Sequence, residues 1–322
     1  ITEQFDEGAD LVITFVAGYS LAADVENLTL GGSIIDGSGN GLANLMTGNA
    51  ADNTLSGGIG NDTLDGQDGT DTLQGGDDDD FYMVDTATDT IEDSGGIDTV
   101  LSSVQFNLSS ALVNSGADIE HLIYTGTSDV SLKGSASANS IFGGTGNDTL
   151  EGMALKDTLI GGAGNDFYVL TTNDDDVIVD ILGIDTVLVS GTLNLTTLSG
   201  GSSIENIKLT AGSGSLIGNS LGNTITGFTS SDTLVGGTGN DSLSGDSGDD
   251  FLAGSSTAAF GAGEVDTLTG NLGSDTFVLG DSANVYYASG ATADYAIITD
   301  FSKGIDALQL NGSVGDLSLI HI

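Results

Sequence analysis

The chain has 322 residues, including 51 Gly, and sets 47 acidic residues against four basic ones, without any Pro, Cys or Trp. The net charge of −43 argues against nucleic acid and anionic membranes as partners, and the lack of Cys excludes disulfides. Its most apolar stretch, residues 11–23, is too short to span a bilayer, so we expect no membrane insertion. Acidic chains with few aromatics are usually disordered, yet 38% of residues are hydrophobic. We therefore expect bound cations to neutralise the carboxylates.

A nine-residue repeat recurs along the chain. Each frame begins with Gly, nearly always has Asp or Asn sixth, and has an apolar residue eighth. Five frames cover residues 39–83, four cover 134–169, four cover 218–253 and two cover 261–278. The clearest frames are GGIGNDTLD from Gly57, GGTGNDTLE from Gly143, GGAGNDFYV from Gly161 and GGTGNDSLS from Gly236. A fixed period of this kind predicts a repeat architecture.

A longer period lies above the nonapeptides. The segments between arrays repeat Glu26, Glu120 and Glu205 in one motif, and Asp10, Asp98, Asp185 and Asp306 in another. We therefore predict tandem super-repeats: 1–83 (array 39–83), 84–169 (array 134–169), 170–278 (arrays 218–253 and 261–278) and a partial one, 279–322. Both ends fall inside a super-repeat, as expected of a fragment or of a subunit completed by its neighbours. We expect the segments between arrays to continue the same fold.

Three kinds of residue in these segments have candidate roles. We favour a structural hydrogen-bonding role for the recurring Glu residues, with metal ligation as the alternative. The recurring Asp residues fit turn capping and metal binding equally. His121 occupies the position of an Asn in the other super-repeats, so we expect a residue stacked in a sheet rather than a catalyst.

The frame matches the GGxGxDxUx pattern, and the chain therefore resembles the RTX family of secreted bacterial proteins. The nonapeptides cover somewhat less than half of the sequence. The resemblance implies an all-β fold, a right-handed parallel β-roll or β-solenoid, that requires calcium. It also implies type I-like export of the unfolded chain and an extracellular or cell-surface location. Members of the family share no single activity.

In such a fold, six residues of each nonapeptide form a turn and three form a strand whose apolar eighth residue points inward. Two nonapeptides make a coil of 18 residues, and coils stack at about 4.8 Å. We expect Gly at the first, second and fourth positions to allow positive φ and to direct carbonyl groups at one point. Calcium takes six to eight oxygens, so the turn stacked 18 residues further on would complete each site.

This reasoning predicts several calcium ions per chain. The expected ligands are the carboxylates of Asp62, Asp71, Asp80, Asp148, Asp157, Asp166, Asp232, Asp241, Asp250, Asp266 and Asp275, and the carbonyls of Gly58, Gly60, Gly144, Gly146, Gly162, Gly164, Gly237 and Gly239. We pair Asp62 with Asp80, Asp148 with Asp166, and Asp232 with Asp250. Asp71, Asp157 and Asp241 face Asn53, Asn139 and Asn223, where an uncharged oxygen predicts weaker sites. Magnesium demands a tighter octahedron, and zinc would need clusters of His or Cys.

Because such sites do not exist in the unfolded chain, calcium binding would drive folding. We find no catalytic motif and expect a protein that is not an enzyme. The leading hypothesis is a secreted subunit of a surface layer, fibre or adhesin that polymerises with copies of itself, end to end or laterally. The alternative is the export and folding module of a secreted hydrolase or toxin. Ice or carbohydrate binding by a flat face is weaker, since the chain lacks a long ladder of paired Thr.

Overall fold

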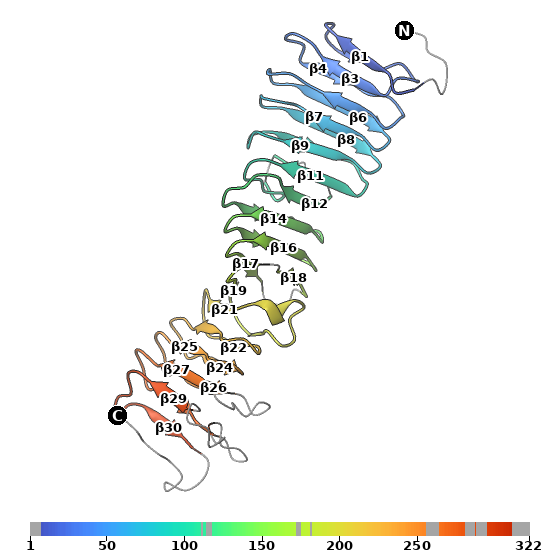
Figure 1. Ribbon diagram of the computed structural model, residues 1–322. Coiled ribbons are helices and arrows are strands. Elements are labelled where there is room, and N and C mark those ends of the chain that lie inside the picture. Colours follow the sequence, from blue (N-terminus) through green and yellow to red (C-terminus); the bar gives the residue numbers. More distant parts are fainter. Residues whose placement is uncertain are drawn as a thin grey trace. The chain divides into compact units, whose positions relative to one another are not determined.

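The computed structural model describes residues 8–110, 112–113, 118–171, 175–180, 182–255, 264–280, 287 and 295–310. The chain divides into two compact units, Ile1–Gly164 and Asn165–Ile322. Nearly all regular structure is short β-strand (Figure 1). The described residues include one short 3₁₀ helix, Gly201–Ser203, and no helix long and apolar enough to cross a membrane.

The first unit is a parallel β-solenoid in which the chain alternates between two sides of each coil. One sheet has the order β1 (Leu11–Thr14), β3 (Asn27–Leu30), β5 (Leu45–Thr47), β7 (Thr63–Asp65), β9 (Phe81–Val84), β11 (Asp98–Ser102), β12 (Ile119–Tyr124), β14 (Ser140–Thr145), β16 (Thr158–Ala163). Across from it lie β2 (Tyr19–Ser20), β4 (Asp36–Ser38), β6 (Thr54–Ile59), β8 (Thr72–Asp77) and β10 (Thr90–Glu92), and further along β13 (Ser131–Lys133) pairs with β15 (Thr149–Glu151).

The second unit is built in the same way. One sheet has the order β17 (Phe167–Leu170), β19 (Thr186–Val189), β21 (Asn206–Leu209), β23 (Thr224–Thr226), β25 (Ser242–Ser244), β27 (Val265–Thr269), β29 (Tyr295–Ile298). The other has the order β20 (Leu193–Asn194), β22 (Ser215–Ile217), β24 (Thr233–Gly237), β26 (Phe251–Ser255), β28 (Thr276–Val278), β30 (Ala307–Gln309). A further strand, β18, is Val177–Val179.

The register confirms the 18-residue coil. Thr54 pairs with Thr72, and Thr72 pairs with Thr90, each 18 residues further along the chain. Every such pairing is parallel, because each coil returns to the same side in the same direction. Strands β9, β11, β12 and β14 are consecutive neighbours in one sheet, so the segment between the first two arrays continues the solenoid, as expected.

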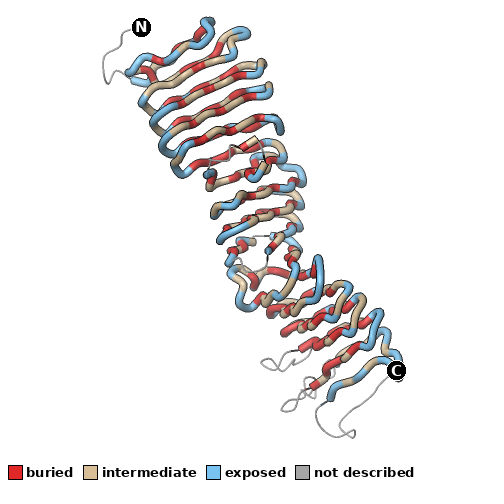
Figure 2. The backbone as a smooth tube through the Cα atoms, turned by 180° about the vertical axis from the view of Figure 1, so that it is seen from behind, coloured by how far each residue is buried: buried red, intermediate tan, exposed pale blue. Residues whose placement is uncertain are grey.

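The core is a stack of eighth-position side chains, and this prediction is also confirmed. The fully buried members include the predicted Leu55, Leu64, Leu73, Tyr82, Ile141, Leu150, Leu159 and Tyr168. Figure 2 shows buried residues recurring in every coil, alternating with more exposed ones. Burying each of these side chains contributes about 1.5–3 kcal/mol, and a strand of three residues has one such position. The core of a coil is therefore thin, and its turns must supply further stability.

Some strands are longer than the predicted three residues. Strands β6, β8, β14 and β16 each have six, because they run on through the two glycines that begin the next nonapeptide. Gly58 pairs there with Gly76, and a Cβ on Gly76 would clash with the carbonyl oxygen of Gly58. The paired glycines thus let neighbouring turns approach more closely than side chains would allow.

Candidate metal sites

The predicted carboxylates lie inside the solenoid, not on its surface. All eleven sixth-position Asp residues of the prediction are at most 3% exposed. They form ladders in which each carboxylate accepts a hydrogen bond from the backbone of the preceding coil. The Asn44 amide donates to Asp62 Oδ1, the Asp62 amide to Asp80 Oδ1, and the Asp80 amide to Asp98 Oδ1, each at 2.7 Å. The predicted pair Asp62 and Asp80 is therefore brought together.

Equivalent ladders run along the other edges of the coils. In the first unit the amides of Asn53, Val130 and Asn139 donate to Asp71, Asp148 and Asp157. In the second unit the amides of Asp166, Asn223, Asp241, Asp232 and Asp250 donate to Asp185, Asp241, Asp266, Asp250 and Asp275. The structure thus brings Asp232 and Asp250 together, and it places Asp71, Asp157 and Asp241 opposite the predicted Asn residues. Asp148 and Asp166 belong to different units, and each lies in the ladder of its own unit.

The second carboxylate oxygen of many ladder residues is buried and lacks a hydrogen-bond partner. This holds for Oδ2 of Asp62, Asp71, Asp80, Asp241 and Asp250. A buried acceptor without a donor costs about 1–3 kcal/mol, and more when it is charged. Because oxygen is the ligand that calcium prefers, these atoms fit a bound calcium ion, which would remove the cost.

The same burial raises the pKa of these carboxyls. The pKa rises to about 6 for Asp62, about 7 for Asp80 and about 8 for Asp241. Loss of solvent is the largest cause, the ladder hydrogen bond opposes it, and neighbouring carboxylates raise the pKa further. A bound cation would lower these pKa values and allow every carboxylate to ionise near neutral pH.

Turns that leave this oxygen without a partner share one backbone shape, which we call the open turn. Its second and fourth residues both have positive φ, for example 116° at Gly58 and 105° at Gly60. All eight glycines predicted as ligands have positive φ, between 99° and 139°. Their carbonyl groups remain predicted ligands. Gln67, Met153, Asp246 and Asn271 adopt the same second-position conformation without being glycine, so the shape persists where the side chain opposes it.

The prediction of positive φ was wrong for the first-position glycine, whose φ is not positive. It serves a different purpose. A Cβ added to Gly57 would fall on the carboxylate of Asp62, 2.6 Å from its Cγ. Gly66, Gly152 and Gly245 stand in the same relation to Asp71, Asp157 and Asp250. This glycine therefore leaves room for the sixth-position carboxylate to fold back over its own turn.

A second turn shape, which we call the closed turn, occurs at the Asn residues for which weaker sites were predicted. In turns beginning at Gly39, Gly48, Gly134 and Gly218, the second residue's amide donates to Oδ1 of the sixth-position Asn at 2.7–2.8 Å. The Asn side-chain amide then donates to carbonyls of the preceding coil, as Asn53 does to Ile34. The Asn oxygen therefore already accepts one hydrogen bond in these rungs, and the weaker calcium sites with Asn stay a prediction.

Asp232 also lies in a closed turn. Its Oδ1 accepts from the Gly214 amide and its Oδ2 from the Phe228 amide, both at 2.7 Å. The second residue is only part of the signal that separates the two shapes, because Asn271 has positive φ as in an open turn. Closed turns have Asn, Ser or Phe at the second position, and their second residues do not have positive φ. A reading based on the sixth position alone misses this distinction.

The recurring residues between arrays extend the ladders. Asp98, Asp185 and Asp306 each accept from the amide of the Asp one coil earlier. The carboxylates of Glu26, Glu120 and Glu205 accept in turn from the amides of Asp10, Asp98 and Asp185 at 2.7–2.9 Å. The favoured hydrogen-bonding role of the Glu residues is thus confirmed. His121 stacks between Thr99 and Ser140 in the sheet, as expected.

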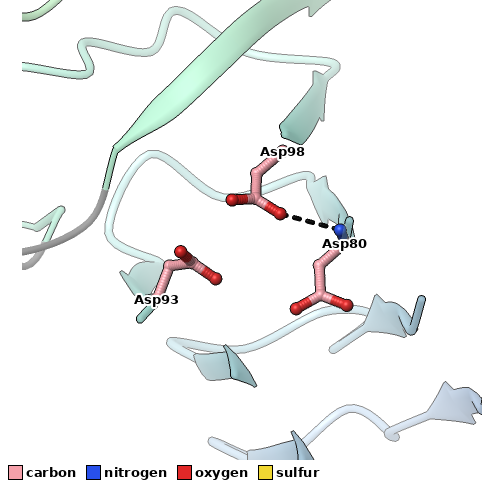
Figure 3. A group of neighbouring side chains, drawn as sticks. All are labelled: Asp80, Asp93 and Asp98. Atoms are coloured by element: carbon pink, nitrogen blue, oxygen red, sulfur yellow. Dashed lines mark hydrogen bonds between the residues drawn. The ribbon is translucent and has the colours of Figure 1, made fainter. Parts of the chain in front are cut away.

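One group of acidic residues converges more tightly than an ordinary rung. Asp80, Asp93 and Asp98 each offer a carboxylate oxygen, and these three oxygens lie within 4.8 Å of one another in a buried position (Figure 3). Asp93 was not among the predicted ligands, because it lies outside the nonapeptide frame. Asp93 directly follows Glu92, the last residue of β10, and this is the position that a first-position glycine occupies in the two preceding coils.

Comparison with known proteins agrees with this geometry. The family model described as RTX calcium-binding nonapeptide repeat (four copies) matches residues 35–82, 122–150, 133–168, 143–178, 226–256 and 260–291, which together cover more than half of the chain. No curated protein matches the sequence. The matched segments contain the open turns and their buried, unpartnered carboxylate oxygens. The chain therefore belongs to the RTX calcium-binding nonapeptide repeat family, and its cofactor is calcium, bound at several sites.

Proposed function

We propose that this protein is an extracellular structural protein that folds on binding calcium and assembles with copies of itself into a surface layer, fibre or adhesin. The observation that carries the proposal is the set of buried carboxylate ladders whose second oxygens lack partners. The chain has only four basic residues to balance 47 acidic ones. A fold that buries its acidic groups in this way depends on an external supply of cations.

The dependence of folding on calcium indicates where the protein folds, because the free calcium concentration differs between the inside and the outside of a cell. The open turns do not exist in an unfolded chain, so the free energy of calcium binding becomes free energy of folding. Extracellular calcium modules bind at about 10⁻⁴–10⁻³ M, well above the free calcium of a cytosol. A chain of this kind stays unfolded inside the cell and folds after export.

The outer surface of the first unit supports lateral assembly. On the sheet formed by β1, β3, β5, β7 and β9, the outward side chains include Leu11 and Ile13 at 58% exposure, Leu45 at 47%, Phe81 at 43% and Met83 at 41%. The register sets these residues in two rows, interleaved with Thr, Asn and one Asp, Asp65. Exposed apolar side chains grouped on one sheet in this way are typical of an interaction site. Bound calcium would lower the repulsion between two acidic copies.

We also propose that the chain is not an enzyme. Its described His, His121, is stacked in a sheet between Thr99 and Ser140, and the second His, His321, lies outside the described residues. The buried carboxylates are arranged in a regular series along the solenoid, which suits repeated metal binding better than a single reaction centre.

The test is a calcium titration of the purified chain from EGTA, followed by circular dichroism and light scattering. We expect a cooperative gain of β signal near millimolar calcium, followed by a rise in scattering. Replacing Phe81 and Met83 by Ser should abolish the rise while leaving the β signal intact. The matched control is Ile59→Ser, a 58% exposed position on the other sheet.

Each other outcome has a clear meaning. Folding without any rise in scattering would reject assembly and favour the folding module of a secreted enzyme. A β signal that is complete in EGTA and unchanged by calcium would reject calcium-dependent folding. Equal loss of scattering in the Ile59 control would show that assembly does not use the β1–β9 surface.

A further inference from the structure

The last coil of the first array departs from the nonapeptide frame at one position. Ser56 pairs with Gln74, and Gln74 pairs with Glu92. The residues that follow these three are Gly57, Gly75 and Asp93. Asp93 therefore occupies the slot in which the two preceding coils have the glycine that leaves room for a ladder carboxylate.

At this slot Asp93 directs its own carboxylate toward the ladder. Figure 3 shows it facing Asp80 and Asp98, which belong to successive rungs. Asp80 and Asp98 are fully buried and Asp93 is 6% exposed. Asp93 Oδ1 accepts a 2.7 Å hydrogen bond from the hydroxyl of Tyr82, a fully buried core residue. Asp93 is thus held in place from the core side.

Each of the three carboxylates retains one buried oxygen without a partner. These are Oδ2 of Asp80, Asp93 and Asp98. Three carboxylates in one buried space cannot all ionise unless a cation joins them.

We propose that Asp80, Asp93 and Asp98 form a divalent-cation site that contains one more carboxylate than an ordinary rung and fills with calcium before the other sites. This inference rests on the proposed calcium-dependent folding, and it identifies the site at which calcium binding begins. Calcium affinity is tuned by the number of charged ligands and by the rigidity of the site. The third carboxylate provides the charge, and the Tyr82 hydrogen bond provides the rigidity.

The second unit contains a related pair of Asp residues. Asp180 and Asp185 follow Tyr168 with the same five-residue step that separates Asp93 from Asp98, although Asp180 lies one residue further from its Tyr than Asp93 does. Asp180 Oδ1 and Asp185 Oδ2 are buried and lack partners.

The experiment measures calcium binding to the full chain by competition with a chromophoric chelator. We expect the wild-type chain to show a tight class of sites followed by a weaker class. Asp93→Asn should weaken part of the tight class by about tenfold or more and leave the weaker class unchanged. Asp85→Asn removes the same charge from an exposed position just after β9 and should change neither class.

A second variant and a second probe keep the test valid if Asp93→Asn fails to fold. Asp93→Gly restores the residue that the frame has at this slot, so it should fold and still lose the tight site. Terbium provides the independent reading, because the chain has no Trp and tyrosine is its sensitiser. Emission at the lowest terbium concentrations should fall clearly in Tyr82→Phe, because Tyr82 is the tyrosine that contacts Asp93.

An unchanged tight class in both Asp93 variants would overturn the inference while leaving calcium-dependent folding in place. If neither variant folds, undiminished early terbium emission in Tyr82→Phe would overturn it. A wild-type chain that binds no calcium would instead reject the proposed function itself.

Discussion

Adding a single methyl group to Gly57 should displace a ladder carboxylate. In Gly57→Ala the new Cβ would lie 2.6 Å from Asp62 Cγ and 2.8 Å from Asp62 Cβ, closer than carbon atoms can approach. The Asp62 side chain must then leave its position, and its 2.7 Å hydrogen bond from the Asn44 amide is lost. The backbone around Gly57 cannot yield easily, because β6 is paired on both sides.

The magnitude follows from two contributions. A hydrogen bond to a charged group is worth about 1.5–3 kcal/mol, and forcing a side chain off its preferred rotamer costs about 0.5–1.5 kcal/mol. The free energy of unfolding in calcium should therefore fall by about 2–4 kcal/mol. The calcium concentration needed for folding should rise as well, because Asp62 no longer contributes its oxygen.

The assay is urea unfolding in millimolar calcium, followed by circular dichroism. Gly41→Ala is the matched control, since Gly41 lies in a closed turn of the same unit and nothing lies within 4 Å of its added Cβ. That control should be neutral or more stable by about 0.4–1 kcal/mol, because Ala restricts the unfolded chain. Equal stability of the two variants would refute the explanation given for the first-position glycine.

Three further results are expected. In EGTA, the β signal should be larger near pH 4 than near pH 8, because the pKa of Asp80 is raised to about 7 and that of Asp241 to about 8. The folded chain keeps protons there that the unfolded chain, with pKa values near 3.8, has released, so the free energy of unfolding falls as pH rises, and circular dichroism at several pH values measures the trend. Asn53→Asp should destabilise the chain by about 1–3 kcal/mol even in calcium, because a carboxylate oxygen would replace the amide that donates to the Ile34 carbonyl. Met153→Gly should raise stability by about 1 kcal/mol, measured as a thermal midpoint, because Met153 has φ of 88°.

Each of these expectations has an opposing result. A metal-free chain that gains stability with rising pH would contradict the raised pKa values. An additional bound calcium ion in Asn53→Asp would show that a closed turn converts to an open one. Ala154→Gly is the control for Met153, since its φ is not positive, and an equal gain there would exclude relief of backbone strain.

The nine-residue frame was sufficient to predict the repeating part of the fold. An apolar residue every nine positions, as at Leu55, Leu64 and Leu73, can face one core only if the chain turns between them. The sixth-position Asp and the 18-residue step then predict which carboxylates lie together, as Asp62 and Asp80 do. These features are local and periodic, so a short segment already contains the information.

The calcium resemblance rests on the same periodicity. The matched family segments coincide with the arrays visible in the sequence. The choice between open and closed turns differs from one nonapeptide to the next, as the turns with Gly58 and Asn49 illustrate, but the second residue alone does not set it, since Asn271 also has positive φ. It was missed because attention to the sixth position treated Asp and Asn as equivalent oxygen donors, whereas the Asn amide also donates hydrogen bonds.

The sequence by itself therefore determined the coil, the core and the position of each ladder carboxylate, because all three repeat with the same period. Only the tertiary structure decided where a residue outside the nonapeptide period joins the ladder carboxylates. Asp93 reads as an ordinary acidic residue between arrays, and its approach to Asp80 and Asp98 depends on how three successive strands stack. The same holds for the first-position glycine, whose neighbour is a side chain folded back across its own turn. Distances across a turn are set by the backbone path, and a linear pattern does not contain that path.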